Sequence, residues 1–155
     1  ENMEVIWQCG KYYKPSVDRF MKEAEAEGMG GGCLRYITHS DFIQRMDLAY
    51  AAADVVISRS GASSISELCA AHKASIFVPS PNVAEDHQTH NAMALVRKDA
   101  AIMIKDSEAV QKLMEEACRL IGDEARRKEM EKNIAGLALK DAAMTIAEEI
   151  YRIIG

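Results

Sequence analysis

Residues 54–68 constrain the fold of this chain more than any other stretch, because an apolar run there gives way to a turn of small residues and then to a helical pattern. Val55–Ile57 is β-branched and too short for a helix, which is typical of a buried parallel strand. Gly61 keeps the turn uncluttered, and Ser64 with Glu67 forms an S-x-x-E capping box that predicts the start of a helix. The stretch therefore predicts a strand, a tight loop and a helix.

A helix start approached by such a loop leaves backbone N–H groups free, so it can hold a phosphate without a metal ion. The amides of Ala62, Ser63 and Ser64 are the candidates for a diphosphate. Glu67 lies one turn further along and can accept hydrogen bonds from vicinal hydroxyls such as those of a ribose. The alternative is that Ser64 and Glu67 only cap their helix.

Composition narrows the class of protein. With 155 residues and 48% apolar content, the chain predicts a single domain over residues 1–155. A formal charge of −5 without a dense Lys/Arg run argues against nucleic-acid binding. The four cysteines are dispersed, which predicts reduced thiols in a cytoplasmic protein. No apolar stretch reaches the roughly 18 residues that span a bilayer, and no signal peptide is recognisable.

Five predicted strands alternate with predicted helices along the chain. The strands are residues 5–9, 34–38, 55–57, 74–78 and 101–104, and the helices are 15–28, 41–53, 64–72, 86–97, 106–121, 123–134 and 141–154. This alternation predicts a doubly wound α/β domain with a parallel sheet. Ligands of such sheets bind at the carboxyl ends of the strands. The candidate loops are Gly10–Lys14, Arg59–Ser64 and Pro79–His87.

A dense polar run, residues 86–91, opens one of the predicted helices at that same edge of the sheet. Its amide and imidazole groups suit sugar hydroxyls, which need both donors and acceptors. One alternative is an exposed polar helix end, and another is zinc bound by His87 and His90, although no third ligand lies at a recognisable spacing. The glycine-rich loop 28–32 follows a helix and precedes a strand, the wrong order for a dinucleotide fingerprint.

Several motifs of other enzyme classes are absent from the sequence. It contains no D-x-D pair for a divalent ion, no G-x-x-x-x-G-K-[ST] and no G-x-S-x-G. Metal-centred sugar transfer, P-loop phosphoryl transfer and α/β-hydrolase chemistry are disfavoured, and we expect no metal or other cofactor.

Two linked motifs, R-S-G-A-x-x-x-x-E at residues 59–67 and D-H-Q-x-x-N-A at residues 86–92, closely resemble one family. Phe42-Ile43, Met46, Ala53-Asp54, Phe77-Val78-Pro79 and residues 138–143 match it as well, and the similarity runs from about Val5 to the final helix. The family is that of MurG, and the match is to its C-terminal, donor-binding domain. These transferases move N-acetylglucosamine (GlcNAc) from UDP-GlcNAc onto lipid-linked muramyl-pentapeptide in peptidoglycan synthesis.

The resemblance implies an inverting, family 28-like glycosyltransferase of the GT-B fold, with UDP-GlcNAc as donor. By position in the motif, the backbone of Ile43 would read the uracil edge and Met46 would pack beside the base. Ala62, Ser63 and Ser64 would bind the diphosphate and Glu67 the ribose, while His87 and Gln88 would meet the sugar. Arg59, Asp86 and Asn91 match the motif as well, and for them the alternative is a role only in shaping the loops.

The chain lacks parts that the family possesses. The family's donor domain opens with a strand and a Gly/Ser-rich loop that precede the stretch seen here, and its N-terminal domain binds the lipid-linked acceptor. We therefore expect a truncated donor half without a catalytic base, inactive alone, from a protein peripheral to the cytoplasmic face of the inner membrane. The alternatives are a stand-alone donor-binding subunit with a membrane partner and a related UDP-GlcNAc 2-epimerase.

Overall fold

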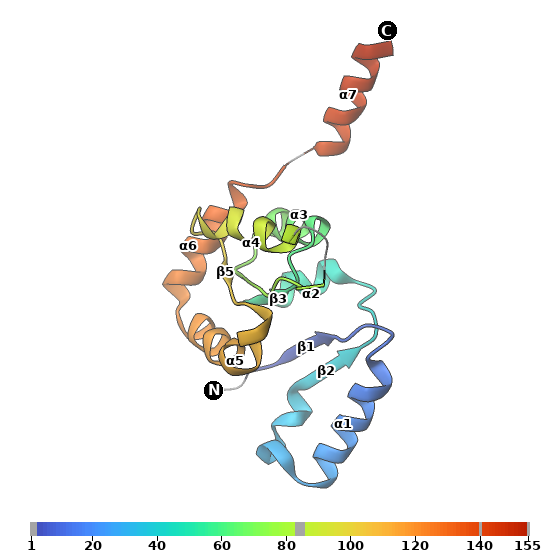
Figure 1. Ribbon diagram of the computed structural model, residues 1–155, viewed down its shortest axis with the longest axis vertical. Helices are drawn as coiled ribbons and strands as arrows, with labels where there is room; N and C mark the ends of the chain where they lie inside the picture. The colour runs from blue at the N-terminus through green and yellow to red at the C-terminus, as the bar shows by residue number, and fades with distance from the viewer. Residues whose placement is uncertain (1–2, 83–85, 140, 155) are drawn as a thin grey trace. The chain divides into compact units, whose positions relative to one another are not determined.

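The computed structural model describes residues 3–82, 86–139 and 141–154. The chain divides into two compact units, Glu1–Ala49 and Tyr50–Gly155, and each is described here by itself. Parallel strands alternate with helices in both units (Figure 1), which confirms the predicted α/β class. Residues 83–85 of the predicted loop Pro79–His87, and Lys140 of the motif at residues 138–143, lie outside the described residues.

The first unit contains a pair of parallel strands, β1 (Val5–Gln8) and β2 (Ile37–Ser40), with Val5 opposite Ile37. They are connected through α1 (Lys14–Ala26) and a 3₁₀ segment, η1 (Met29–Tyr36). The second strand was predicted at residues 34–38, so it begins three residues late. The reason is the glycine-rich segment, in which Gly30, Gly31 and Gly32 all have positive φ and keep the chain in tight turns.

Helix α2 (Met46–Ala52) begins later than the predicted helix at 41–53. The backbone before it is held by side chains instead of by helical bonds. Asp41 Oδ1 accepts from the N–H of Phe42 at 2.9 Å, and Gln8 Oε1 accepts from the N–H of Ile43 at 2.8 Å. Phe42 and Ile43 are therefore outside the helix, and Phe42 is exposed. The helix could be recognised from its apolar spacing, whereas the contact with Gln8 depends on tertiary structure.

The second unit contains a three-stranded parallel sheet of β3 (Val56–Ser58), β4 (Ser75–Phe77) and β5 (Ile102–Met103) in that order. Its helices are α3 (Ala62–Ala71), α4 (His87–Val96), α5 (Asp106–Gly122), α6 (Glu124–Ala135) and α7 (Ala142–Ile154). The central strand β4 is completely buried. A continuous apolar run is typical of such a strand.

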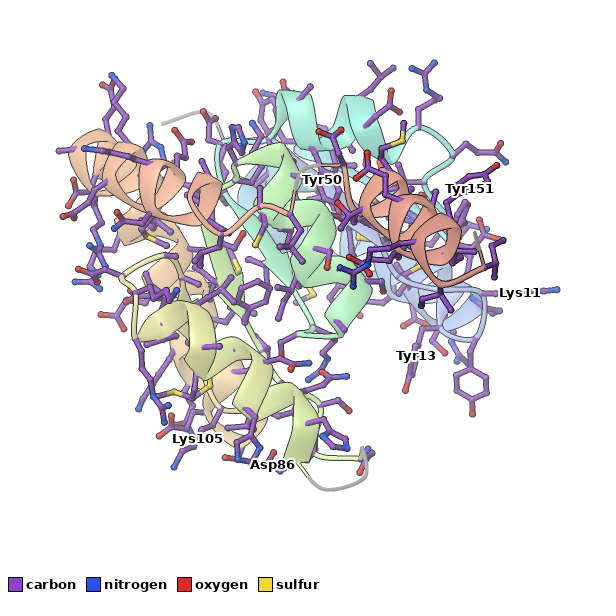
Figure 2. All side chains as sticks on the ribbon, turned by 90° about the horizontal axis from the view of Figure 1, so that it is seen from above. Lys11, Tyr13, Tyr50, Asp86, Lys105 and Tyr151 are labelled. Atoms are coloured by element: carbon purple, nitrogen blue, oxygen red, sulfur yellow. The ribbon has the colours of Figure 1, made fainter. Side chains whose placement is uncertain are left out.

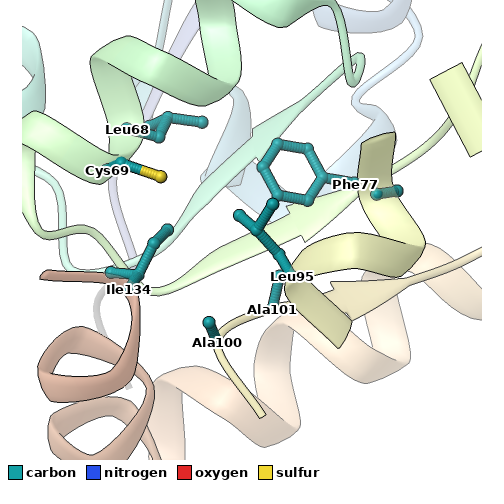
Figure 3. Packing of buried hydrophobic residues seen from close by; sticks show 8 residues of the cluster. Leu68, Cys69, Phe77, Leu95, Ala100, Ala101 and Ile134 are labelled. Carbon is teal, nitrogen blue, oxygen red and sulfur yellow. The ribbon is translucent and has the colours of Figure 1, made fainter. Parts of the chain in front are cut away.

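Two core clusters lie on opposite faces of this sheet, because successive residues of a strand point to opposite sides. Phe77 belongs to the first cluster, with Leu68 and Cys69 of α3, Leu95 of α4 and Ile134 of α6 (Figure 3). The other cluster joins Ile76 to residues of α5 and α6, namely Ala117, Leu120 and Met130. Helices cover both faces, as predicted for a doubly wound sheet.

Not every apolar side chain of the helices is buried. Leu120 of α5 is buried, but Val110 is 98% exposed and Met114 is 55% exposed, because only the line of Ala109, Leu113, Ala117 and Leu120 meets the sheet. Among the described residues of α7 none is buried, so its apolar stripe has no counterpart in the core. All four cysteines are free, yet Cys33 and Cys118 are exposed, and only Cys69 fills a core position.

None of the helices in the described ranges is long and apolar enough to cross a membrane.

Helix α6 begins at a side-chain cap, because Asp123 Oδ1 accepts from the N–H of Arg126 at 2.9 Å. Replacing Asp123 with alanine is expected to lower the free energy of unfolding by about 1 kcal/mol, since one N–H of the first turn loses its acceptor. Denaturant unfolding measures this change. Asp123→Asn retains an acceptor and should stay close to wild type. An equal loss in both variants would mean that the charge, not the cap, stabilises the helix.

Candidate functional site

At the start of α3, three backbone N–H groups have no hydrogen-bond acceptor among the described residues. Gly61 is the N-cap residue, in an extended conformation (φ −64°, ψ 149°), and no side-chain hydrogen bond caps the helix. The first bond of the helix runs from the N–H of Ile65 to the carbonyl of Gly61 at 3.0 Å. The N–H groups of Ala62, Ser63 and Ser64 precede that bond, so they have no partner within the helix. The helix start at which an anion was predicted to bind is therefore uncapped, and anion binding there stays a prediction.

The predicted capping box is wrong. Ser64 is the third residue of α3, not its N-cap, because the helix already begins at Ala62. Glu67 does not reach back to the helix start either, since its Oε2 accepts a hydrogen bond from the hydroxyl of Tyr50 at 3.1 Å. The interpretation in which Ser64 and Glu67 serve only as caps is excluded, and both remain candidates for ligand contacts.

Gly61 and the first turn of α3 lie at the surface of the protein. A Cβ built on Gly61 would meet only the Oγ of Ser64, at 4.0 Å. Ala62, Ser63 and Glu67 are exposed, and Ser64 is half-buried. Two of the three residues that carry these amides, Ala62 and Ser63, are therefore open to solvent. The helix dipole adds to the attraction for negative charge at this end.

Hydrogen bonds join the two sequence motifs to each other. Ser60 is fully buried, and its hydroxyl donates to the carbonyl of Gln88 at 2.8 Å. Asn91 Nδ2 donates to the carbonyl of Ser60 at 3.2 Å. The side-chain oxygen of Gln88 accepts from the N–H of Ser80 at 2.9 Å. The loop after β3, the loop after β4 and the start of α4 are thus fixed relative to one another.

Arg59 fixes a further element at the same edge. Its guanidinium donates to the carbonyls of Val78 at 3.1 Å and Pro79 at 3.3 Å, and it forms an ion pair with Asp106, the first residue of α5. These contacts, with those of Asn91, fit the expectation that both residues shape the loops. Such a network is a source of rigidity, which a binding site of backbone amides needs.

Asp86 and the histidines lie at the start of α4, where Figure 2 labels Asp86. Asp86 occupies the predicted N-cap position with a left-handed backbone (φ 54°), but its side chain makes no capping bond. The ring Nδ1 of His90 contacts the carbonyl of Asp86 at 3.1 Å. Within the described ranges, no group of three His, Cys, Asp or Glu side chains is placed to hold a metal ion. His87 is exposed.

Ile43 and Met46 belong to the first unit, and both are half-buried. The N–H of Ile43 is engaged by Gln8 Oε1. The backbone of Ile43 was predicted to bond to the edge of a base. Because its N–H is already bonded to Gln8, the carbonyl of Ile43 is the backbone group left for that contact. No local sequence pattern could predict this bond, because its two residues are 35 positions apart.

Tyr50 was not among the predicted site residues. Its ring packs against the cluster around Leu68 and Phe77, while its hydroxyl reaches Glu67. Burial first, and the hydrogen bond to Glu67 second, raise the pKa of Tyr50 from 10.0 to about 12. The only local signal was a tyrosine in an otherwise apolar helix face, which is typical of ordinary core packing.

Spectroscopic titration can test this pKa. Of the five tyrosines, one phenol is expected to ionise only near pH 12, and Tyr50→Phe should remove that late transition. Because the folded pKa exceeds the unfolded value, the stability that this phenol contributes is complete below about pH 10 and is lost as the pH rises to about 12. Glu67→Gln should lower the pKa. An unchanged late transition in the Tyr50→Phe variant would contradict the assignment.

Comparison with known proteins identifies the family. The family model of the glycosyltransferase family 28 C-terminal domain matches residues 1–146. The chain belongs to glycosyltransferase family 28. The match covers both compact units and both sequence motifs. It confirms the family that the residues at 59–67 and 86–92 predicted.

Two relatives of this family 28 chain carry the name UDP-N-acetylglucosamine–N-acetylmuramyl-(pentapeptide) pyrophosphoryl-undecaprenol N-acetylglucosamine transferase. The protein from Bacteroides thetaiotaomicron is 51% identical over 152 residues, which are 98% of this chain and 39% of the relative. That from Flavobacterium psychrophilum is 44% identical over 154 residues, which are 99% of this chain and 39% of the relative. The chain thus spans about two fifths of the length of these relatives.

Solved structures confirm the fold of the family 28 chain. Acinetobacter baumannii MurG has a TM-score of 0.79 and 26% identity, over 97% of this chain and 41% of the MurG chain. The glycotransferase of kitacinnamycin has a TM-score of 0.67 and 20% identity, over 96% of this chain and 34% of that one. The predicted resemblance to the C-terminal domain of MurG is confirmed, as is the predicted GT-B type of fold.

Proposed function

We propose that this chain is the UDP-GlcNAc-binding half of an inverting glycosyltransferase that transfers GlcNAc to lipid-linked muramyl-pentapeptide in peptidoglycan synthesis. The observation that carries the proposal is the uncapped start of α3, with three free amides at Ala62–Ser64 and the Glu67 carboxylate on the same helix. The names of the relatives supply the donor and the acceptor.

Each part of the donor has a candidate partner. The amides of Ala62, Ser63 and Ser64 bind the diphosphate, and Glu67 accepts hydrogen bonds from the ribose hydroxyls. The carbonyl of Ile43 accepts from the N–H of uracil, with Met46 beside the base. His87 and Gln88 contact the sugar, and the bond from Ser80 to Gln88 holds that amide in one orientation.

The start of α3 also suits the leaving group. When the acceptor hydroxyl attacks the anomeric carbon, the bond to the diphosphate breaks and negative charge develops on UDP. Fixed N–H donors and the positive end of a helix stabilise such charge without reorganising. The scheme requires no metal ion. The base that removes the acceptor proton is not one of the residues assigned here, and we place it in the acceptor-binding part of the complete protein.

We further propose that the two compact units form one donor domain, which the span of the family model supports. The complete protein would work at the cytoplasmic face of the inner membrane, where the lipid-linked acceptor is anchored. It would have the lipid-linked acceptor as its second substrate and no nucleic-acid partner.

The test is a transfer assay on the complete gene product. With UDP-GlcNAc and the lipid-linked muramyl-pentapeptide, we expect GlcNAc to appear on the lipid with an inverted anomeric configuration. Epimerised sugar without transfer would replace this proposal with the 2-epimerase. Transfer by the 155 residues alone would overturn our placement of the base.

A further inference from the structure

We propose that Tyr50 is a positioning residue, which holds the Glu67 carboxylate in the orientation that receives the ribose hydroxyls. This inference rests on the proposed function, because it concerns the same nucleotide site. It assigns a role to a residue that lies outside both sequence motifs, in a different helix.

The two residues of the contact between Tyr50 and Glu67 differ in burial, because Tyr50 packs against the core and Glu67 is exposed. The ring of Tyr50 packs against the buried cluster around Leu68 and Phe77, so its position is set by the core. Its hydroxyl donates to Oε2 of Glu67 at 3.1 Å, and Glu67 itself is exposed. Within the part of the chain that the structure describes, the Glu67 side chain therefore bonds to a group whose own position the core determines. Figure 2 labels Tyr50 beside the ribbon of α3.

Holding the carboxylate in this way favours binding through entropy. An unrestrained glutamate on a helix surface loses rotamer freedom when it binds a ligand, and this loss of entropy opposes binding. The hydrogen bond from Tyr50 already restricts the rotamers of Glu67 in the folded protein, so less rotamer entropy is lost when the nucleotide binds.

The hydrogen bond from Tyr50 leaves most acceptor positions of the Glu67 carboxylate available to a ligand. An ionised carboxylate has about four acceptor positions on two oxygens, and Tyr50 uses one of them. The remaining positions, including all those on Oε1, can accept from two vicinal hydroxyls. The raised pKa of Tyr50, about 12, keeps the phenol a donor at any pH at which the protein works.

A second link between the same two segments provides a matched control. Lys73, which follows α3, donates from Nζ to the carbonyls of Ala53 at 2.9 Å and Ala51 at 3.5 Å, at the end of α2. Lys73→Met removes this link without touching Glu67. If the role of Tyr50 were only to fasten α2 to α3, losing Lys73 should have the same consequences for binding.

The experiment compares two nucleotides on the complete gene product. UDP and 2′,3′-dideoxy-UDP differ only in the ribose hydroxyls, so the ratio of their dissociation constants reports the hydroxyl contacts. We expect Tyr50→Phe to weaken UDP binding about 3- to 10-fold and dideoxy-UDP binding less than about 2-fold. In Tyr50→Phe, the ratio of the two dissociation constants should move from the wild-type value toward the value for Glu67→Gln. In Lys73→Met it should keep the wild-type value. The midpoint of thermal unfolding of each variant is measured in parallel.

The outcomes separate this inference from the function on which it rests. A wild-type protein that discriminates between the nucleotides, with an unchanged ratio in Tyr50→Phe, would overturn the role of Tyr50 and leave the proposed function standing. The same would follow if Lys73→Met lowered the ratio as much as Tyr50→Phe. A wild-type protein that binds neither nucleotide would overturn the proposed function together with this inference.

Discussion

Replacing Ala62 with proline is expected to weaken UDP binding about 10- to 100-fold while the chain stays folded, because proline removes one of the three free amides. A hydrogen bond from such an N–H to a charged phosphate contributes about 1.5–3 kcal/mol. The local backbone accommodates the change. Proline is favoured at the first position of a helix, and Gly61 has the extended conformation that the residue before a proline adopts.

Calorimetry with UDP and with uridine, on the complete gene product, separates the phosphate contact from the rest of the site. Uridine lacks the diphosphate, so its affinity should not change in Ala62→Pro. Ala62→Gly retains the N–H and serves as the control for loss of the methyl group. A parallel loss for uridine and UDP would show that the substitution disturbs the nucleoside contacts, and the amides of α3 would no longer be the diphosphate site.

Glu67→Ala is expected to weaken UDP binding by about 1.5–3 kcal/mol, because the ribose loses charge-assisted hydrogen bonds. The side chain is exposed, and among the described residues its hydrogen-bond partner is Tyr50, so the fold should persist. Binding of 2′,3′-dideoxy-UDP should change little, since that nucleotide has no hydroxyls for the carboxylate to accept from.

Titration calorimetry of the two nucleotides measures both effects, and Glu115→Ala is a suitable control because Glu115 is an exposed carboxylate on α5. It removes the same charge at a place remote in sequence from the motifs. Unchanged UDP affinity in Glu67→Ala would exclude Glu67 from the nucleotide site. Its carboxylate would then be only the acceptor of the Tyr50 bond.

The helices and strands of this chain were largely predictable, because their signals are local. Short β-branched runs and helical spacing of apolar residues depend on neighbours a few positions away. They located all five strands within a few residues. The exposed Val110 shows the limit of such local signals. Spacing predicts which apolar residues share a helix face, but not how much of that face the sheet covers.

The site was predictable where a motif implied it, and wrong where a local rule competed with tertiary contacts. An S-x-x-E pattern predicted a capping box at Ser64, yet α3 begins two residues earlier and Glu67 turns to Tyr50, 17 positions away. Asp106 pairs with Arg59 across 47 positions. A sequence pattern confined to about ten residues cannot include both members of a pair that is so far apart along the chain.

The sequence by itself determined the parallel α/β architecture, the family and the helix start at which a diphosphate is expected. Those features follow from the apolar period and from motif spacing, both of which are written along the chain. Only the tertiary structure decided that the amides of Ala62–Ser64 are left uncapped and that the Glu67 carboxylate is held by a phenol from α2. The physical reason is that a side chain bonds to whichever partner folding brings within about 3 Å, and that partner need not be near in sequence.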